Sequence, residues 1–425
     1  MDLLQYVSLA TTPHQAVAAG ADYLKERGFE ELTLGKAFDI KKGGKYYLNA
    51  YSTSLIAFTI GENTTENQVF HVAAAHTDHP CLHIKPKAEL APSKYLKIDT
   101  EIYGGPILNT WLDRPLSIAG RVALKGADIY HPEIKLVDFA RPVAIIPNLA
   151  IHFNRKVNEG IELNKQSDML PIIGLFEESM NKDNYFLELL AKECNVAAED
   201  ILDFDLYVYA LEPGSYVGVN EEMISAPRLD NLTSCFALLY GIGGEVRKDG
   251  INVAILFDHE EIGSRSKQGA DSALLQMVLE KIYVALGFDK NALADSIFNS
   301  FLFSADVAHA VHPHHPEKYD PVNVANFNEG IVLKLNSNQR YTFDTEAVAI
   351  AQGICEASGV KYQKFANRSD VAGGGTLGPI ISGWLPMKTV DIGVPILAMH
   401  SARELMGRKD QEYLEMLMAG FFEKE

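Results

Sequence analysis

Histidine and carboxylate side chains follow four apolar runs of this sequence, each close to the point where the run ends. They are His76 and Asp78, Glu260 and Glu261, Asp306, and His400. A charge directly after a buried strand is costly unless it is paired or bound to a ligand. Imidazole and carboxylate are the ligands that zinc accepts where it keeps one coordination position open for water. These residue types therefore indicate metal-dependent chemistry.

The number of donors fits two metal ions rather than one. Two histidines and three carboxylates can serve two ions about 3.5–4 Å apart, provided that one carboxylate bridges them. The water between the ions then needs a further carboxylate as general base. The adjacent Glu260 and Glu261 can divide these tasks, one binding metal and the other moving protons. Asp78 can hydrogen-bond the far nitrogen of His76 and so fix its tautomer.

Each candidate also has an interpretation without chemistry. Asp230 precedes an apolar helical run that begins near Asn231, where a carboxylate is a common helix N-cap. A lone histidine is more often a hydrogen-bonded core or surface residue, and an acidic pair is often solvated. The whole set, rather than any single member, favours a hydrolytic metal site.

The apolar runs have the length and composition of buried strands. Strands are expected within 68–76, 251–260, 296–309 and 391–401, and helices within 12–28, 231–250 and 271–288. Strands that alternate with helices predict an α/β sheet covered by helices. Such sheets bind their ligands at the carboxyl ends of the strands, so the candidate residues are expected to converge in one crevice.

The middle of the chain has a different pattern. It combines β-like pieces such as LSIAGRVAL (116–124) with irregular, proline-containing segments and a helix around 183–194. We therefore predict a catalytic domain formed by residues 1–90 and 218–425, interrupted by a second domain at 91–217.

Composition limits the class of protein further. The chain has 425 residues, a net charge of −18 and four widely spaced cysteines without a CxxC pattern. The acidic balance argues against nucleic acid as a partner, and the cysteine usage indicates reduced thiols in the cytoplasm. No run approaches the roughly 18 apolar residues of a membrane span, and the N-terminus lacks the pattern of a secretory signal. We expect a soluble, cytoplasmic protein that binds neither nucleic acid nor membrane.

The order His-x-Asp, Asp, Glu-Glu, Asp, His resembles that of the co-catalytic zinc exopeptidases. Longer strings narrow the resemblance to the aspartyl aminopeptidase family, with similarity from about residue 12 to the C-terminus. They are HTDHP (76–80), TWLDRPLSIAGRV (110–122), APRLDN (226–231), DHEEIGSRSKQGA (258–270), SADVAHAVHP (304–313), NSNQRY (336–341) and IGVPILAMHSARE (392–404).

The resemblance implies a zinc-exopeptidase-like α/β/α catalytic domain with an inserted, mainly β, dimerisation domain. It implies a metalloaminopeptidase that removes the N-terminal residue of peptides with a water activated by two divalent ions. Zinc is expected, although cobalt or manganese would also fit the donors. The subunits would assemble from dimers into a homo-oligomeric dodecamer.

The resemblance also implies roles for single residues. One ion would be held by His76, Asp230 and Asp306, and the other by Asp230, Glu261 and His400, with Asp230 as the bridge and Glu260 as the general base. Substrate contacts would come from His309, Lys334 and Tyr341, and from His152 of a neighbouring subunit. Lys334 ends the apolar run GIVLK and is either a solvated surface lysine or, if it faces the pocket, a cation that would favour N-terminal Asp or Glu. His79, at an expected serine, and the altered segment after His312 depart from the family pattern near the site.

Two alternatives stay open. A related deacetylase or carboxypeptidase would have the same metal core, and a non-catalytic oligomeric scaffold would have the same fold. The intact Glu260–Glu261 pair weighs against the scaffold, which has no use for an unligated base. The tract HAVHPHHP (309–316) is predicted to be a surface loop beyond His309, because its prolines do not fix a coordination geometry.

Overall fold

The computed structural model describes residues 1–178, 180–181 and 183–423. The chain divides into two compact units. The first consists of Met1–Asp78, Gly214–Met399 and Glu404–Glu425, and the second of His79–Pro213 and His400–Arg403. The second unit begins at 79 and ends its main segment at 213, where the sequence predicted bounds at 91 and 217. Its function in dimerisation stays a prediction.

The first unit contains a nine-stranded sheet in the order β1-β2-β3-β13-β4-β14-β18-β16-β17. The strands are β1 Glu30–Leu32, β2 Lys45–Ala50, β3 Ser54–Ile60, β4 Phe70–His76, β13 Ile251–Phe257, β14 Phe301–Ala305, β16 Ile331–Leu335, β17 Tyr362–Ala366 and β18 Lys388–Gly393. The neighbours β13, β4, β14 and β18 run parallel to one another. Their carboxyl ends therefore share one edge of the sheet, while β16 runs antiparallel to β18.

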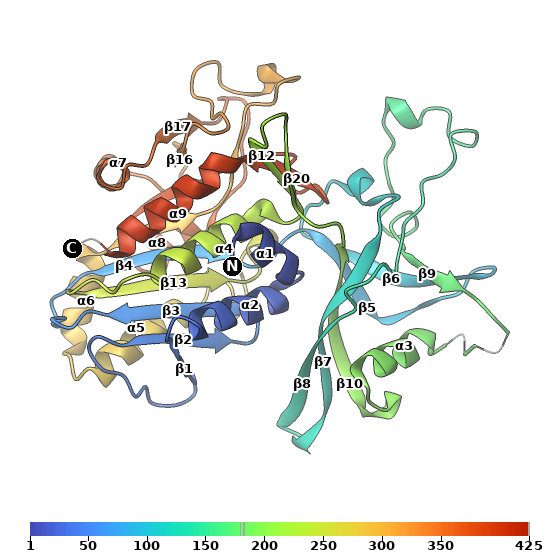
Figure 1. Ribbon diagram of the computed structural model, residues 1–425, viewed down its shortest axis with the longest axis horizontal. Helices are drawn as coiled ribbons and strands as arrows, with labels where there is room; N and C mark the ends of the chain where they lie inside the picture. Colours follow the sequence, from blue (N-terminus) through green and yellow to red (C-terminus); the bar gives the residue numbers. More distant parts are fainter. Residues whose placement is uncertain (179, 182, 424–425) are drawn as a thin grey trace. The chain divides into compact units, whose positions relative to one another are not determined.

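Helices cover both faces of this sheet. One layer contains α1 Leu3–Leu9, α2 Pro13–Lys25, α4 Leu229–Ile242, α7 Thr345–Ala357 and α9 Arg408–Glu423, and the other contains α5 Leu274–Ala285, α6 Lys290–Asn299 and α8 Leu377–Trp384. Successive residues of β4 show the two faces, because Ala73 and Ala75 pack in the first core and Val72 and Ala74 in the second. Figure 1 shows α4 and α9 side by side over the sheet. The predicted α/β/α class is confirmed.

A small five-stranded sheet completes the first unit. Its order is β11-β12-β20-β19-β15, and its strands are β11 Ser215–Val217, β12 Met223–Ala226, β15 Ala308–His309, β19 Pro395–Leu397 and β20 Glu404–Gly407. Single-turn 3₁₀ helices lie at Glu260–Ile262 and Pro316–Lys318. The sheet joins segments that are more than 170 residues apart in sequence, since Glu404 of β20 pairs with Ala226 of β12.

The second unit is built on a six-stranded antiparallel sheet in the order β8-β7-β10-β5-β6-β9. Its strands are β5 Cys81–Leu90, β6 Tyr95–Tyr103, β7 Leu116–Asp128, β8 His131–Asp138, β9 Ile172–Leu175 and β10 Ile201–Ala210, with helix α3 Tyr185–Cys194 and 3₁₀ turns at Leu108–Trp111, Val157–Glu159 and Ala198–Asp200. One face of the sheet and α3 enclose an apolar core of their own.

One local prediction and one alternative interpretation were wrong. The run 296–309 was expected to be one strand, but α6 extends to Asn299 and β14 begins at Phe301. Asp289 caps this helix by accepting the Asn291 N–H, and Leu293 and Ile297, four residues apart, face the core. Asp230 is not the N-cap of α4 either. Arg228 holds that position, and Asp230 has non-helical backbone angles of φ −80° and ψ 104°.

Within the described residues, the structure contains no helix that is both long and apolar enough to cross a membrane.

Candidate functional site

Three neighbouring strands bring most of the candidate residues to one edge of the nine-stranded sheet. His76 is the last residue of β4, Asp306 directly follows β14, and Glu260 and Glu261 form the turn after β13. Because these strands are parallel neighbours, their ends meet. Asp230 reaches the same place from the first turn of α4, where the helical backbone is interrupted.

The distances around His76 fit a shared metal ion. Its Nε2 lies 3.5 Å from Oδ1 of Asp230 and 3.6 Å from Oδ1 of Asp306. Donor atoms that share a tetrahedral zinc at its usual bond lengths lie about 3.3 Å apart. The three side chains are buried, and one donor atom of each lies within 4.8 Å of the other two. These residues therefore have the chemistry and the spacing to hold a divalent cation.

The same cluster continues toward the two glutamates. The donor oxygens of Asp230 and Glu261 lie within 4.8 Å of one another, so Asp230 has His76 and Asp306 as neighbours and also Glu261. Glu260 is further from the imidazole, with Oε2 4.0 Å from Nε2 of His76. This arrangement leaves Glu260 beside the cluster rather than at its centre.

Asp78 orients both glutamates through their backbone. Its Oδ1 accepts the N–H of Glu260 at 3.0 Å, and its Oδ2 accepts the N–H of Glu261 at 3.1 Å. The predicted partner of Asp78 was Nδ1 of His76, which lies 3.4 Å from the Asp78 carboxylate. The backbone carbonyl of Asp78 is nearer to that nitrogen, at 3.0 Å. The imidazole is thus oriented mainly by the backbone carbonyl of Asp78, and the glutamate turn by its side chain.

The cluster carries more negative charge than its own side chains compensate. Burial raises the pKa of Glu260 to about 8 against the lowering effect of His76, and burial and Asp230 raise the pKa of Glu261 well above its ordinary value. Burial alone would lower the pKa of His76, but the carboxylates of Asp230, Asp306 and Asp78 raise it well above normal. Bound cations would supply the missing positive charge.

Lys334 approaches the cluster from β16. The sequence left open whether it is a solvated surface lysine, but the side chain is only 2% exposed. Its Nζ donates to the carbonyl of Val307 at 3.0 Å and lies 3.6 Å from Oδ2 of Asp306. Burial tends to lower the pKa of Lys334, but nearby Asp306 and Asp391 raise it above its ordinary value. The lysine is therefore a buried cation paired with a carboxylate of the cluster.

Two further predicted substrate contacts lie in the first unit. Tyr341 is buried, and its ring centroid is 5.1 Å from Nζ of Lys334. His309 ends β15, and its ring centroid lies 6.3 Å from that of Phe365. The structure thus brings Tyr341 next to Lys334, while the substrate contacts of both residues stay predictions.

His400 and His152 belong to the second unit. The Nδ1 atom of His400 is 3.1 Å from the carbonyl oxygen of Gly105, and its own carbonyl accepts the Ile107 N–H at 2.9 Å. His152 is exposed in an irregular turn. That His400 binds metal stays a prediction. The role of His152 in a neighbouring subunit also stays a prediction.

Two residues that support the cluster had no role assigned from the sequence. Glu404 is buried and accepts the backbone N–H of Asp230 at 3.0 Å. Cys235, in α4, donates its thiol to the carbonyl of His76 at 2.9 Å. The sequence feature that could have identified Glu404 is its position at the end of the string IGVPILAMHSARE (392–404). No sequence feature pointed to Cys235, because a cysteine inside an apolar helix is usually only a core residue.

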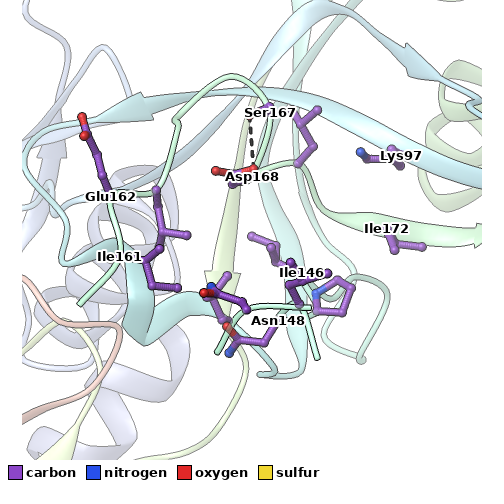
Figure 2. Close-up of a pocket in the computed structure, with 14 residues that line it drawn as sticks. Lys97, Ile146, Asn148, Ile161, Glu162, Ser167, Asp168 and Ile172 are labelled. Carbon is purple, nitrogen blue, oxygen red and sulfur yellow. Dashed lines mark hydrogen bonds between the residues drawn. The ribbon is translucent and has the colours of Figure 1, made fainter. Parts of the chain in front are cut away.

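The second unit contains a pocket of about 290 Å³ (Figure 2). Polar and apolar side chains both line it: Lys97, Leu112, Ile146, Pro147, Asn148, Leu149, Asn154, Ile161, Glu162, Leu163, Ser167, Asp168, Leu170 and Ile172. Ser167 donates its hydroxyl to Asp168 at 3.2 Å within this lining. None of the predicted site residues lines the pocket.

Comparisons with known proteins agree with the chemistry of the cluster. The profile of the aminopeptidase I zinc metalloprotease (M18) family matches residues 6–422. A curated relative from Clostridium novyi, a probable M18 family aminopeptidase 2, is 45% identical over 413 residues, which cover 97% of this chain and 95% of the relative.

Solved structures agree as well. The cryo-EM structure of the Ape4 and Nbr1 complex contains a chain 36% identical to this one, with a TM-score of 0.93 over 99% of this chain and 84% of that one. The S. cerevisiae mApe1 dodecamer is 27% identical, with a TM-score of 0.84 over 99% of this chain and 95% of that one. On these grounds, the chain belongs to the aminopeptidase I zinc metalloprotease (M18) family and is a metalloaminopeptidase.

Proposed function

We propose that this aminopeptidase hydrolyses N-terminal peptide bonds at the carboxyl edge of its nine-stranded sheet, with two zinc ions per subunit. One ion would be held by His76, Asp230 and Asp306, and the other by Asp230, Glu261 and His400. The observation that carries the proposal is the spacing of 3.5 and 3.6 Å between His76 Nε2 and the two aspartate oxygens. Bound zinc would supply a Lewis acid and an activated water.

The protein groups would then divide the remaining work. Glu260 would accept the proton of the attacking water and deliver it to the leaving amine, as a general base and acid. Its position beside the cluster, 4.0 Å from the imidazole, supports this division from Glu261. Asp78 would keep the two glutamates apart in these roles, because each oxygen of its carboxylate holds one backbone N–H.

A metal-dependence assay with matched peptides tests this function. The purified chain is stripped with a chelator and reloaded with zinc, cobalt or manganese. Hydrolysis of peptides with free N-termini should disappear and return, with about two ions bound per chain. Peptides with acetylated N-termini serve as the control. Their hydrolysis would favour a deacetylase, and a fully loaded chain without any activity would favour the scaffold.

A preference for N-terminal Asp or Glu is a finer proposal, supported by the family resemblance and by the presence of Lys334 beside the cluster. A charge-assisted contact to a substrate carboxylate would contribute about 1.5–3 kcal/mol. Substrates with N-terminal Asp, Glu, Leu and Lys would reveal it as a difference of about one to two decades in kcat/KM. A wild-type chain that prefers Leu would refute this preference and leave the hydrolytic mechanism intact.

We further propose that the chain forms a homo-oligomer, a dodecamer built from dimers, in which His152 reaches the active site of a neighbouring subunit. The S. cerevisiae mApe1 dodecamer supports this assembly. Cytoplasmic location is supported by four buried cysteines that form no disulfide. Light scattering on the purified protein measures the assembly. A fully active monomer would refute both the dodecamer and the role of His152.

A further inference from the structure

The first turn of α4 carries Asp230, the candidate bridging ligand, where the backbone departs from helical angles. Asp230 has φ −80° and ψ 104°, and the N-cap residue Arg228 makes no side-chain cap hydrogen bond. The first N–H groups of a helix have no partner within the helix itself. The groups that hold this turn must therefore come from other elements.

Glu404 supplies a partner at Asp230 itself. It begins β20, is 2% exposed, and its Oε2 accepts the backbone N–H of Asp230 at 3.0 Å. Strand pairing brings it there, because Glu404 lies opposite Ala226, the last residue of β12. A carboxylate suits this position, since it makes a stronger hydrogen bond than a neutral acceptor and is favoured at the N-terminus of a helix. Glu404 thus caps α4 from another element of the fold.

The residues on either side of Asp230 are held as well. Nη2 of Arg228 donates to the carbonyl of Val7 in α1 at 3.0 Å. Nδ2 of Asn231 donates to the carbonyl of Ala305, at the end of β14, at 2.9 Å. These two bonds fix the path of the chain before and after Asp230, and the direction of the Asp230 peptide is left to the partner of its own N–H.

We propose that Glu404 is a positioning residue, which holds the backbone of Asp230 so that its carboxylate can reach both proposed zinc ions. This inference rests on the proposed function. Oδ1 of Asp230 lies 3.5 Å from Nε2 of His76, and donor oxygens of Asp230 and Glu261 lie within 4.8 Å of one another. A shift of the Asp230 backbone moves this carboxylate relative to both neighbours, so both ions should be affected together.

The Glu404→Leu variant tests this role, because leucine has a similar size and cannot accept a hydrogen bond. Zinc binding is measured by competition with a chromogenic chelator, independently of activity. We expect both zinc equivalents to bind about 10- to 100-fold more weakly, the usual effect of losing a partner of this kind. Glu404→Gln keeps an oxygen acceptor on a side chain of the same length and should restore most of the affinity.

Asp410 provides a matched control. Its buried carboxylate, in the first turn of α9, accepts the backbone N–H groups of Asn328 and Gly330 at 2.7 and 3.0 Å. Asp410→Ala removes a buried acceptor that holds a different loop, so it should lower thermal stability and leave zinc affinity at the wild-type value. If Glu404→Leu does not fold, Glu404→Asp, which keeps the charge and is one methylene shorter, should show the weaker binding of both ions.

Each outcome decides between causes. Wild-type zinc affinity in Glu404→Leu, or in Glu404→Asp where only that variant folds, would overturn the inference. Weaker binding of one equivalent alone would also overturn it, because a displaced bridge must affect both ions. Equal weakening in Glu404→Gln and Glu404→Leu would assign the effect to charge, and equal weakening in Asp410→Ala to general instability; either would refute positioning by the hydrogen bond. A wild-type chain that binds no zinc would instead refute the proposed function itself.

Discussion

The Asp78→Asn variant tests whether the Asp78 carboxylate positions the turn that contains Glu260 and Glu261. In the wild type, both oxygens of Asp78 accept backbone N–H groups, from Glu260 at 3.0 Å and Glu261 at 3.1 Å. Asparagine keeps one oxygen and places an NH₂ group against the other N–H. The substitution therefore loses one charge-assisted hydrogen bond, worth about 1.5–3 kcal/mol, and converts the other into a weaker neutral one.

Together, these changes remove about 2–4 kcal/mol of the hydrogen-bond energy that holds Glu260 and Glu261 in position. If the whole loss weakens stabilisation of the transition state, kcat should fall by about 30- to 1,000-fold, because about 1.4 kcal/mol corresponds to a factor of ten. The orientation of His76 should be retained, since its Nδ1 is nearer to the backbone carbonyl of Asp78 than to the carboxylate. The zinc equivalent that His76 helps to bind should therefore persist.

The assay combines steady-state kinetics with zinc titration of Asp78→Asn and a matched control. Asp344 also accepts a backbone N–H, from Ala347 at 2.8 Å, but it caps α7. Asp344→Asn should leave both stability and kcat nearly unchanged, because asparagine caps a helix about as well as aspartate does. Asp78→Asn with kcat within threefold of the wild type would refute the positioning of the glutamates by Asp78. Loss of the zinc bound by His76 would show that the carboxylate acts mainly on the imidazole.

Three further predictions concern the cluster itself. Glu260→Gln should keep bound metal and lose about 10²- to 10⁴-fold in turnover, and near-normal kcat in the loaded variant would exclude Glu260 as the base. Asp230→Ala should lose both ions, because a bridging carboxylate touches each; metal analysis that still finds two tightly bound ions would contradict the bridge. Zinc binding to the metal-free protein at pH 7 should release protons, because burial raises the pKa of Glu260 to about 8 and the pKa values of His76 and Glu261 are also raised, whereas a bound cation favours the deprotonated forms. Calorimetry in buffers of different ionisation enthalpy measures the release, which should decrease as the pH rises through and beyond the pKa of about 8 at Glu260; a release independent of pH would contradict these pKa directions.

Much of the site could be predicted from the sequence because its residues follow apolar strands. His76 and Asp306 each stand at the end of a buried run, and β4 and β14 are parallel neighbours in the sheet. Parallel strands with crossover helices place their carboxyl ends at one edge, so a polar residue after each strand is enough to locate the cluster. Local pattern and a general rule of sheet topology together predicted this part of the site.

The tertiary structure decided which side chains and backbone groups contact one another in the cluster. Lys334 lies at the end of the run GIVLK whether it is solvated or buried, and only the packing of β16 places its ammonium beside Asp306. Glu404 contacts the Asp230 backbone across 174 positions of sequence. The physical reason is that hydrophobic periodicity fixes which face of an element is buried, whereas the pairing of distant segments depends on the order of strands in the sheets.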